Sequence, residues 1–363
     1  MARSAPLVAS RQSSMLLVQQ FLTTYLGSWL RTATKGRVTN PPVVITAPAG
    51  TFASAVRDVS VEGAEAKVVH FDENPAALRP LTAAGADARR GTVVDALPEL
   101  LVEAEQAALL LILDVASGSL PLADLTTLLT GPRAGRWPSS DVIAFIRADS
   151  IRRTAAKLIG ERRSEAALEK LDHAVGAEWR TEYHSGGAGA VVRGYLRRLE
   201  AALPGRAWPA AVRVNPNDEP VFWLILITRQ SHGAWAFADA VARARRGWRR
   251  TLRQAGAEKT PQAQLAVEGL QSAERLAVGA ERHEERAVVE SLKRNLLETR
   301  RRVGEFRISD RPREVLDGLF GTADTAQIRA AVRELHAAGK TLSTGVGGDI
   351  RDHVLRLPDR RAR

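Results

Sequence analysis

The sequence predicts an α/β fold, with a doubly wound parallel sheet followed by a smaller C-terminal module. Short apolar segments alternate with helix-like segments over the first 230 residues, which is typical of such sheets. The run Val221–Ile227 is continuously apolar and rich in β-forming residues, as in a strand buried on both faces. The chain has 363 residues and 45% hydrophobic content, enough for two domains with a real core.

The first predicted element is an amphipathic helix over residues 12–34, in which Phe21, Tyr25 and Trp29 recur near helical spacing. Strands are expected at 43–45, 67–71, 91–94, 108–113, 142–146 and 222–227, with helices over 74–83 and 97–105. Residues 151–203 are expected to form a helical insertion between the last two strands. Its segment Ser185–Gly189 is rich in glycine, which predicts a mobile loop.

The C-terminal residues follow a different pattern. Residues 261–303 are rich in Ala, Glu and Arg and predict one or two long helices as a connector. Pro312 is expected to open a helix over 313–320, and Thr325 to cap a second over 326–338. Two strand-like pieces, 340–343 and 353–357, flank a glycine-rich tip at Thr344–Gly348. This order is typical of a winged helix-turn-helix module with a short or missing middle helix. The predicted domains are therefore 1–260, 261–303 and 304–363.

Composition excludes several classes of function. The chain has no cysteine, which excludes disulfides, thiolate metal sites and cysteine nucleophiles. Its seven histidines lack metal-ligand spacing, so no metal site is expected. The apolar runs are too short for a membrane helix and the N-terminus lacks a signal-peptide pattern, so we expect a cytoplasmic protein.

The charge balance is strongly basic, with a formal net charge of +11 and 45 arginines among 52 Lys and Arg. Because arginine binds phosphate through a forked guanidinium, a nucleic-acid partner is one explanation. GC-rich coding explains the same counts without any partner. The densest cluster lies in residues 240–257, which hold no acid. On a helix, one face of this segment would carry Arg246, Arg249, Arg250 and Arg253.

This face is our candidate phosphate contact. Replacing Arg246, Arg249 and Arg250 with glutamate should weaken nucleic-acid binding at every sequence. In the C-terminal module, the arginines expected to face phosphates are Arg329, Arg333, Arg351 and Arg356. The alternative is a winged module that contacts only protein.

A half-complete ligand site is predicted at the carboxyl ends of the strands, where doubly wound sheets bind ligands. A nucleotide-like cofactor needs a glycine-rich turn after the first strand and an acid after the second. Asp72 supplies the acid. The first turn contains Thr46, Ala47 and Gly50, but only that one glycine, and its proline removes a backbone donor. Asp114 ends the fourth strand and is the candidate catalytic residue, with a helix-cap or turn aspartate as the alternative.

Several segments carry a family resemblance in their order along the chain. They are Tyr25–Leu30 (YLGSWL), Val44–Gly50 (VITAPAG), Leu113–Gly118 (LDVASG), Ile143–Ile146 (IAFI) with Arg152 or Arg153 downstream, Gly176–Arg180 (GAEWR), and Phe222–Thr228 followed by His232 and Gly233. Together they resemble the three-Cys-motif partner (TcmP) proteins, which are similar in fold to class I S-adenosylmethionine methyltransferases. The resemblance covers roughly residues 12–250.

The resemblance implies a Rossmann-like, methyltransferase-type sheet and frequently a C-terminal winged module. The chain departs from the family at the cofactor loop and at the segment after Asp114, which lacks a proline and an aromatic. We therefore expect a degenerate, non-catalytic methyltransferase-like protein that uses no cofactor. It would bind nucleic acid, DNA rather than RNA, as a partner in a DNA repair, modification or phage-defence system.

Two alternatives stay open. The first is an active S-adenosylmethionine-dependent nucleic-acid methyltransferase, with Asp72 on the ribose and Asp114 near the methyl acceptor. The second is an assembly scaffold whose winged module binds a protein. The sequence names neither the nucleic acid, nor a protein partner, nor the oligomeric state.

Overall fold

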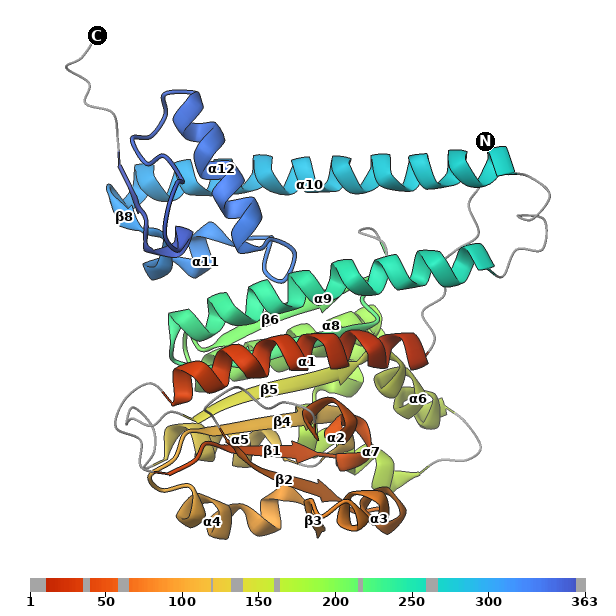
Figure 1. Cartoon of the computed structure of the whole chain (residues 1–363). Coiled ribbons are helices and arrows are strands. Elements are labelled where there is room, and N and C mark those ends of the chain that lie inside the picture. The colour runs from red at the N-terminus through yellow and green to blue at the C-terminus, as the bar shows by residue number, and fades with distance from the viewer. Residues whose placement is uncertain are drawn as a thin grey trace. The chain divides into compact units, whose positions relative to one another are not determined.

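The chain divides into two compact units. The computed structural model describes residues 11–34, 40–57, 65–118, 120–131, 140–159, 164–214, 218–258 and 267–356 (Figure 1). The α/β unit is Val18–Arg229, and the C-terminal unit is Gln230–Arg363 together with residues 1–17. The boundary between the units therefore precedes the predicted domain boundary at residue 260. In the described part of the chain, no helix combines the length and apolarity needed to cross a membrane.

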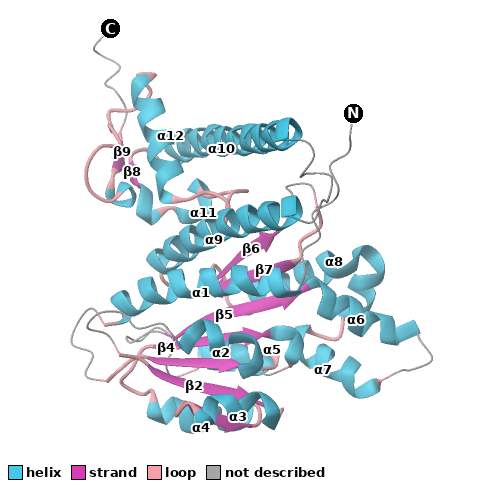
Figure 2. Ribbon diagram, turned by 45° about the vertical axis from the view of Figure 1, so that its right-hand side comes forward, coloured by secondary structure: helices cyan, strands magenta, loops and turns pink. Residues whose placement is uncertain are grey.

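The α/β unit is built on a sheet of seven strands within the described residues. They are β1 (Val43–Ala47), β2 (Lys67–Asp72), β3 (Asp87–Arg90), β4 (Leu109–Asp114), β5 (Ser140–Arg147), β6 (Ala207–Val212) and β7 (Phe222–Ile227). Their order in the sheet is β3-β2-β1-β4-β5-β7-β6 (Figure 2). Strands β1 to β5 are parallel, and β7 runs antiparallel to both of its neighbours. The doubly wound α/β prediction is confirmed, with one reversed strand.

Helices cover the sheet because its central strands are apolar on both faces. The helices of the first half are α1 (Arg11–Ala33), α2 (Ala49–Arg57), α3 (Pro75–Ala83), α4 (Val93–Glu103) and α5 (Leu122–Thr130). On one face, Leu111 and Ala144 share a buried cluster with Leu100 of α4 and other helix residues. On the opposite face, the Phe145 ring lies 6.2 Å from Phe21 of α1. Alternate residues of β5 therefore face the two helical layers.

Two strand predictions need correction. The third strand is Asp87–Arg90 and not 91–94, because Thr92 caps α4 through a hydrogen bond from the Asp95 amide. This strand is at the sheet edge and is polar, so it has no apolar run to detect. The sequence analysis also missed β6, whose Pro209 is exposed. An edge strand tolerates proline because one side of its backbone has no neighbouring strand.

The insertion between β5 and β6 is helical, as predicted. It consists of α6 (Ala148–Ile159), α7 (Glu165–Val175) and α8 (Trp179–Ala202). The predicted loop Ser185–Gly189 is instead a kink inside α8, where Gly186 and Gly187 leave the helical conformation. Gly187 has φ of +63°, a conformation that favours glycine.

The C-terminal unit has its own core. Its elements are α9 (Ser231–Glu258), α10 (Val267–Val303), β8 (Phe306–Arg307), η3 (Ile308–Asp310), α11 (Pro312–Val315), α12 (Thr325–Ala337), η4 (Ile350–Asp352) and β9 (Val354–Leu355). The core joins Trp235 of α9 and Leu292 of α10 with Val315 of α11 and Ile328 of α12. The indole of Trp235 also donates to the Ser309 carbonyl over 3.0 Å, which fastens α9 to η3.

The expected helix–helix–strand order is present, with local corrections. The helix expected over 313–320 ends at Val315, and Gly318 follows at φ of +67°. Asp324, and not Thr325, caps α12. Within the expected piece 353–357, Val354 and Leu355 pair with β8, while Leu342 of the piece 340–343 donates to the Arg356 carbonyl over 3.1 Å. The winged-helix assignment itself stays a prediction.

Candidate functional site

The topological switch point of the sheet lies between β1 and β4. From β1 the chain continues to β2 and β3 on one side, and β4 and β5 lie on the other side. Ligands of doubly wound sheets bind beyond the carboxyl ends of the strands at such a point. The residues that follow β1, β2, β4 and β5 therefore define the candidate ligand edge. All of the predicted cofactor and catalytic residues lie along it.

Asp72, at the end of β2, is the acid expected to hold a ribose. One of its carboxylate oxygens accepts a hydrogen bond of 3.0 Å from the Gly50 amide in the first turn of α2. The other accepts one of 2.9 Å from the Asn74 amide. Asp72 therefore stabilises the start of α2, as a negative charge at a helix N-terminus does. Each oxygen of the carboxylate that a ribose would need therefore already accepts one backbone hydrogen bond.

The turn after β1 is closely packed. Thr46 is buried, and its hydroxyl lies 2.7 Å from Nδ1 of the buried His70 on β2. Ala47 and Ala49 are both at most 1% exposed, and the peptide bond from Ala47 to Pro48 is cis. A Cβ at Gly50 would lie 3.3 Å from the Ala77 methyl group, so the glycine permits close packing of α2 on α3.

A side chain from the helical insertion spans this edge. The ammonium of Lys170 on α7 lies 2.6 Å from a carboxylate oxygen of Glu73, which follows β2. The stem of Lys170 lies against Gly118 beyond β4, where a Cβ would come within 2.5 Å of its Cγ. Because β1 lies between β2 and β4, the Lys170 side chain crosses the carboxyl end of β1. We call this contact the Lys170 strap.

Asp114 forms a buried ion pair with Arg147. Asp114 ends β4 and is 1% exposed, and Arg147 ends the neighbouring strand β5. The guanidinium lies 2.8 Å from the carboxylate of Asp114. Burial raises the pKa of Asp114, while the charge of Arg147 and a hydrogen bond from the Ala116 backbone oppose that rise. Asp114 is at the N-cap position of the short helix Val115–Ser117, as the cap alternative predicted, and its side chain is in addition held by a cation at the ligand edge.

Sequence analysis missed both cations at this edge. Arg147 could have been found, because charged residues that end adjacent parallel strands lie close together. The position of Lys170 had no signal in the sequence. Trp179 and Arg180 of the segment Gly176–Arg180 instead bind Asp172 of α7, over 2.6 Å and 3.1 Å. That segment fastens α7 to α8.

Charge is divided unequally between the two units. The C-terminal unit carries 28 Lys and Arg against 18 Asp and Glu, a formal +10. The α/β unit carries 24 against 23, a formal +1. The excess of basic over acidic residues therefore belongs to the C-terminal unit, although arginine dominates the basic residues of both units.

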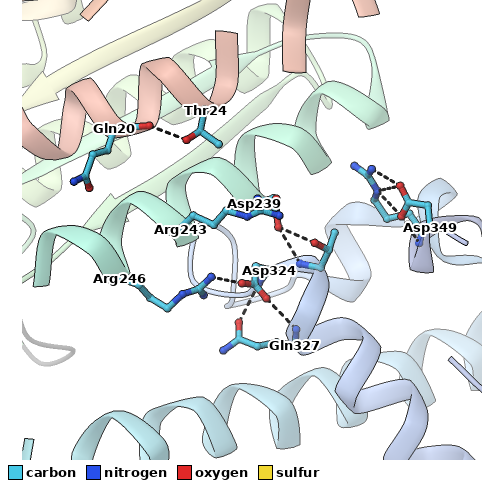
Figure 3. A network of polar contacts seen from close by, with 10 residues as sticks. Gln20, Thr24, Asp239, Arg243, Arg246, Asp324, Gln327 and Asp349 are labelled. Atoms are coloured by element: carbon cyan, nitrogen blue, oxygen red, sulfur yellow. Dashed lines mark hydrogen bonds and ion pairs between the residues drawn. The ribbon is translucent and has the colours of Figure 1, made fainter. Parts of the chain in front are cut away.

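The arginines of α9 bind groups inside the C-terminal unit. Arg246 pairs with Asp324, which is 6% exposed (Figure 3), and Arg249 lies 2.7 Å from Glu284 of α10. Arg245 is buried and donates to the Gly321 carbonyl over 2.9 Å. Of the four arginines predicted to share a phosphate-binding face, Arg250 is exposed and the side chain of Arg253 lies outside the described residues.

Asp324 and Thr325 place the start of α12 against α9. The Asp324 carboxylate accepts from Arg246 and from the Gln327 amide of its capping box (Figure 3). The Thr325 amide and hydroxyl both donate to Asp239 of α9 over 3.0 Å. In helix-turn-helix proteins, the first residues of the recognition helix contact base edges. Here the first residues of α12 contact α9 instead.

The four arginines predicted in the C-terminal module have different environments, and Arg356 among them is exposed. Arg329 donates to the carbonyls of Gly345, Gly347 and Gly348 over 2.9 Å, 3.1 Å and 2.7 Å. Arg351 pairs with Asp349 (Figure 3), and the hydrogen bond from Arg351 lowers the pKa of the Asp349 carboxyl. Arg333 is exposed on α12. Phosphate binding by these residues stays a prediction. In the described part of the chain, no group of three His, Asp or Glu could hold a metal ion.

Comparison with known proteins gives distant structural neighbours alone. No family model matches the chain, and no curated protein matches its sequence. One similar solved structure is the plantazolicin methyltransferase BamL, in complex with a triazolic desmethylPZN analog and SAH. It has 11% identity over 59% of this chain and 84% of that chain, with a TM-score of 0.29.

A second is the plantazolicin methyltransferase BpumL in complex with SAH. It has 9% identity over 60% of this chain and 87% of that chain, with a TM-score of 0.34. TM-scores this low support no conclusion about the activity of this chain.

Proposed function

We propose that this chain is a methyltransferase-like protein without a working donor site, which binds nucleic acid through its C-terminal unit. Such a protein would act as a partner in a DNA repair, modification or phage-defence system, with DNA as the nucleic acid. The parallel sheet with one reversed strand agrees with the methyltransferase-type fold that the family resemblance implies.

The residues at the ligand edge do not fit a ribose-bearing methyl donor. Both oxygens of Asp72 accept backbone hydrogen bonds, from Gly50 and Asn74. Proline and two buried alanines occupy the turn where a donor needs free backbone amides. The Lys170 strap crosses the same edge. We therefore assign no chemical step to a bound donor.

The uneven charge of the two units is the main support for the proposal that the C-terminal unit binds nucleic acid. A formal +10 on one unit attracts polyanions, whereas the +1 on the other does not. Arginine dominates this excess, and its guanidinium matches phosphate oxygens in a bidentate geometry. A scaffold that binds a neutral protein surface would not need this charge.

The test is binding of the full chain to a short DNA duplex by fluorescence anisotropy, between 50 and 200 mM salt. We expect affinity to fall steeply with salt, because binding to phosphates releases counterions. Affinity independent of salt, or the absence of binding at 50 mM salt, would contradict the proposal and favour the assembly scaffold.

A working methyltransferase is the second candidate, and the Asp114–Arg147 pair favours it. A buried carboxylate held by a cation at the ligand edge is the kind of group that active sites contain. Calorimetry with S-adenosylmethionine separates the two candidates. Micromolar binding that Asp72→Ala abolishes would support the enzyme and overturn the proposal of a lost donor site.

A further inference from the structure

We infer that the C-terminal end of α10 and the strand pair beside it form the surface that contacts the phosphate backbone of duplex DNA. This inference rests on the proposed function and locates it. The surface, which we call the basic end, consists of Arg300, Arg301, Arg307, Lys340 and Arg356. It shares no residue with the α9 face that the sequence suggests.

One hydrogen bond brings Arg300 and its neighbour Arg301 close to Lys340. The guanidinium of Arg300 donates to the Lys340 carbonyl over 2.5 Å, which places the end of α10 beside the segment that follows α12. Arg301 is the next residue and is exposed, as is Lys340. Partial burial and the positive charge of Arg301 both lower the pKa of Arg300. Like charges therefore gather at this point without a matching acid in contact with Arg300.

The strand pair adds the other two residues. Phe306 pairs with Leu355 and Arg307 with Val354. Phe306 and Leu355 are buried in the core, so the alternate residues Arg307 and Arg356 extend from the opposite face of the pair. The Arg356 carbonyl also accepts from Leu342, two residues after Lys340. The five cations therefore lie on adjoining backbone segments.

The local geometry explains why cations collect here. The last turn of α10 exposes backbone carbonyls, whose partial negative charge favours arginine at this helix end. Glu305 precedes Phe306 and is exposed, so within the described residues an acid also lies near Arg307 in the chain. Arg302 lies 3.4 Å from Glu314 and is not counted in this surface. The surface keeps a clear positive excess.

The start of α12 does not offer the same access. Its first residues, Asp324 and Thr325, are bound to α9, and Arg329 is bound to three backbone carbonyls. Contacts to base edges carry sequence information, whereas contacts to phosphates do not. The basic end therefore predicts DNA binding with little sequence preference.

The experiment compares two triple variants of the full chain with equal changes of charge. The test variant carries Arg301→Gln, Lys340→Gln and Arg356→Gln. The matched control carries Arg250→Gln, Arg282→Gln and Arg286→Gln, all exposed and outside the basic end. Arg286 and Arg301 lie about 22 Å apart along α10, from the rise of an α-helix.

We measure anisotropy with two duplexes of unrelated sequence and cosedimentation with phosphatidylserine vesicles. The test variant should bind both duplexes roughly 100-fold more weakly at 150 mM salt, because three phosphate contacts are lost. Its salt slope should fall by about 2 to 3, and the control should keep most of its affinity. Circular dichroism and thermal melting establish that both variants stay folded.

The other possible results contradict either the proposed function or the assignment of the basic end. If the unaltered chain binds no duplex, the proposed function fails and this inference fails with it. If the chain binds but both variants lose affinity equally, the basic end is wrong while the proposed function stands. A control weaker than the test variant would restore the α9 face. Binding to the vesicles in place of duplex would identify an anionic membrane as the partner and would overturn the inference.

Discussion

The arginines of α9 and those at the end of α10 look alike in sequence, but the structure uses them differently. Arg246 and Arg249 on α9 pair with Asp324 and Glu284. Arg301, at the end of α10, is exposed. The α9 residues hold the C-terminal unit together, whereas the α10 residues leave their charge on its surface. A cluster of arginines therefore becomes a charged surface only where folding brings no acid to it.

The difference arises from acids that are distant in sequence. Asp324 is 78 residues from Arg246, and Glu284 is 35 residues from Arg249. A gap in acids over residues 240–257 therefore gives no information about the charge around the folded helix. The following predictions test the difference between internal and surface cations, from the largest expected effect to the smallest.

Arg147→Ala should have the largest effect, because it leaves the buried Asp114 carboxylate without its cation. We expect the free energy of unfolding to fall by about 3 kcal/mol at pH 7, as for a broken buried ion pair. Burial raises the pKa of Asp114 in the folded state, so protonation in acid relieves the cost.

The loss of unfolding free energy in Arg147→Ala should therefore be smallest below the pKa that Asp114 has in the unfolded state. It should grow as the pH rises through the pKa that Asp114 has in the folded state. Urea unfolding of the variant and the parent between pH 4 and pH 7 measures this. A loss that does not change with pH would mean that Arg147 acts through packing and not through its charge.

Arg246→Ala should come next, with a loss of about 2 kcal/mol, because it leaves Asp324 largely buried at the start of α12. The side chain of Arg246 is 32% exposed, which reduces the cost below that of a fully buried pair. Hydrogen exchange of the amides in the first turn of α12 should speed up in this variant.

Arg250→Ala on the same helix is the matched control and should change stability by less than about 0.5 kcal/mol. Equal effects of the two substitutions would remove the distinction between internal and surface arginines on α9. A greater effect of Arg250→Ala on DNA binding than on stability would return this residue to the candidate phosphate contacts.

Lys170→Ala should have the smallest effect. The Lys170 and Glu73 side chains are 41% and 60% exposed, and such pairs contribute about 0–1 kcal/mol. The Lys170 strap would therefore act by occupying the ligand edge, with little effect on stability. Calorimetry with S-adenosylmethionine distinguishes its role from that of Asp72. Binding gained by this variant alone would show that the strap, and not the engaged carboxylate, keeps a donor out.

Much of the α/β unit could be predicted from sequence because its central strands are continuous apolar runs. The segments 108–113 and 222–227 lie within one residue of β4 and β7. The edge strands β3 and β6 were not predicted correctly, because β3 is polar and β6 contains Pro209. The kink at Gly186 was predicted as a loop, since glycines are equally typical of a loop.

The candidate site was predictable in position but not in its contacts. Asp72 and Asp114 do end their strands, as the alternation of strands and helices implies. The contacts around them depend on backbone paths and on a helix far along the chain, which local patterns do not encode. The Gly50 amide, which donates to Asp72, illustrates the first case, and Lys170, which pairs with Glu73, illustrates the second.

The glycine-rich tip at Thr344–Gly348 has a consequence for recognition. Its composition suggests a flexible segment, but Arg329 donates to three of its carbonyls. One of these is the Gly347 oxygen, which also lies 3.1 Å from Nε2 of His353. Val346, which is 66% exposed, is thus presented on a backbone that is already ordered. The tip itself would therefore lose little conformational entropy when another molecule binds it, so a small contact area could suffice there.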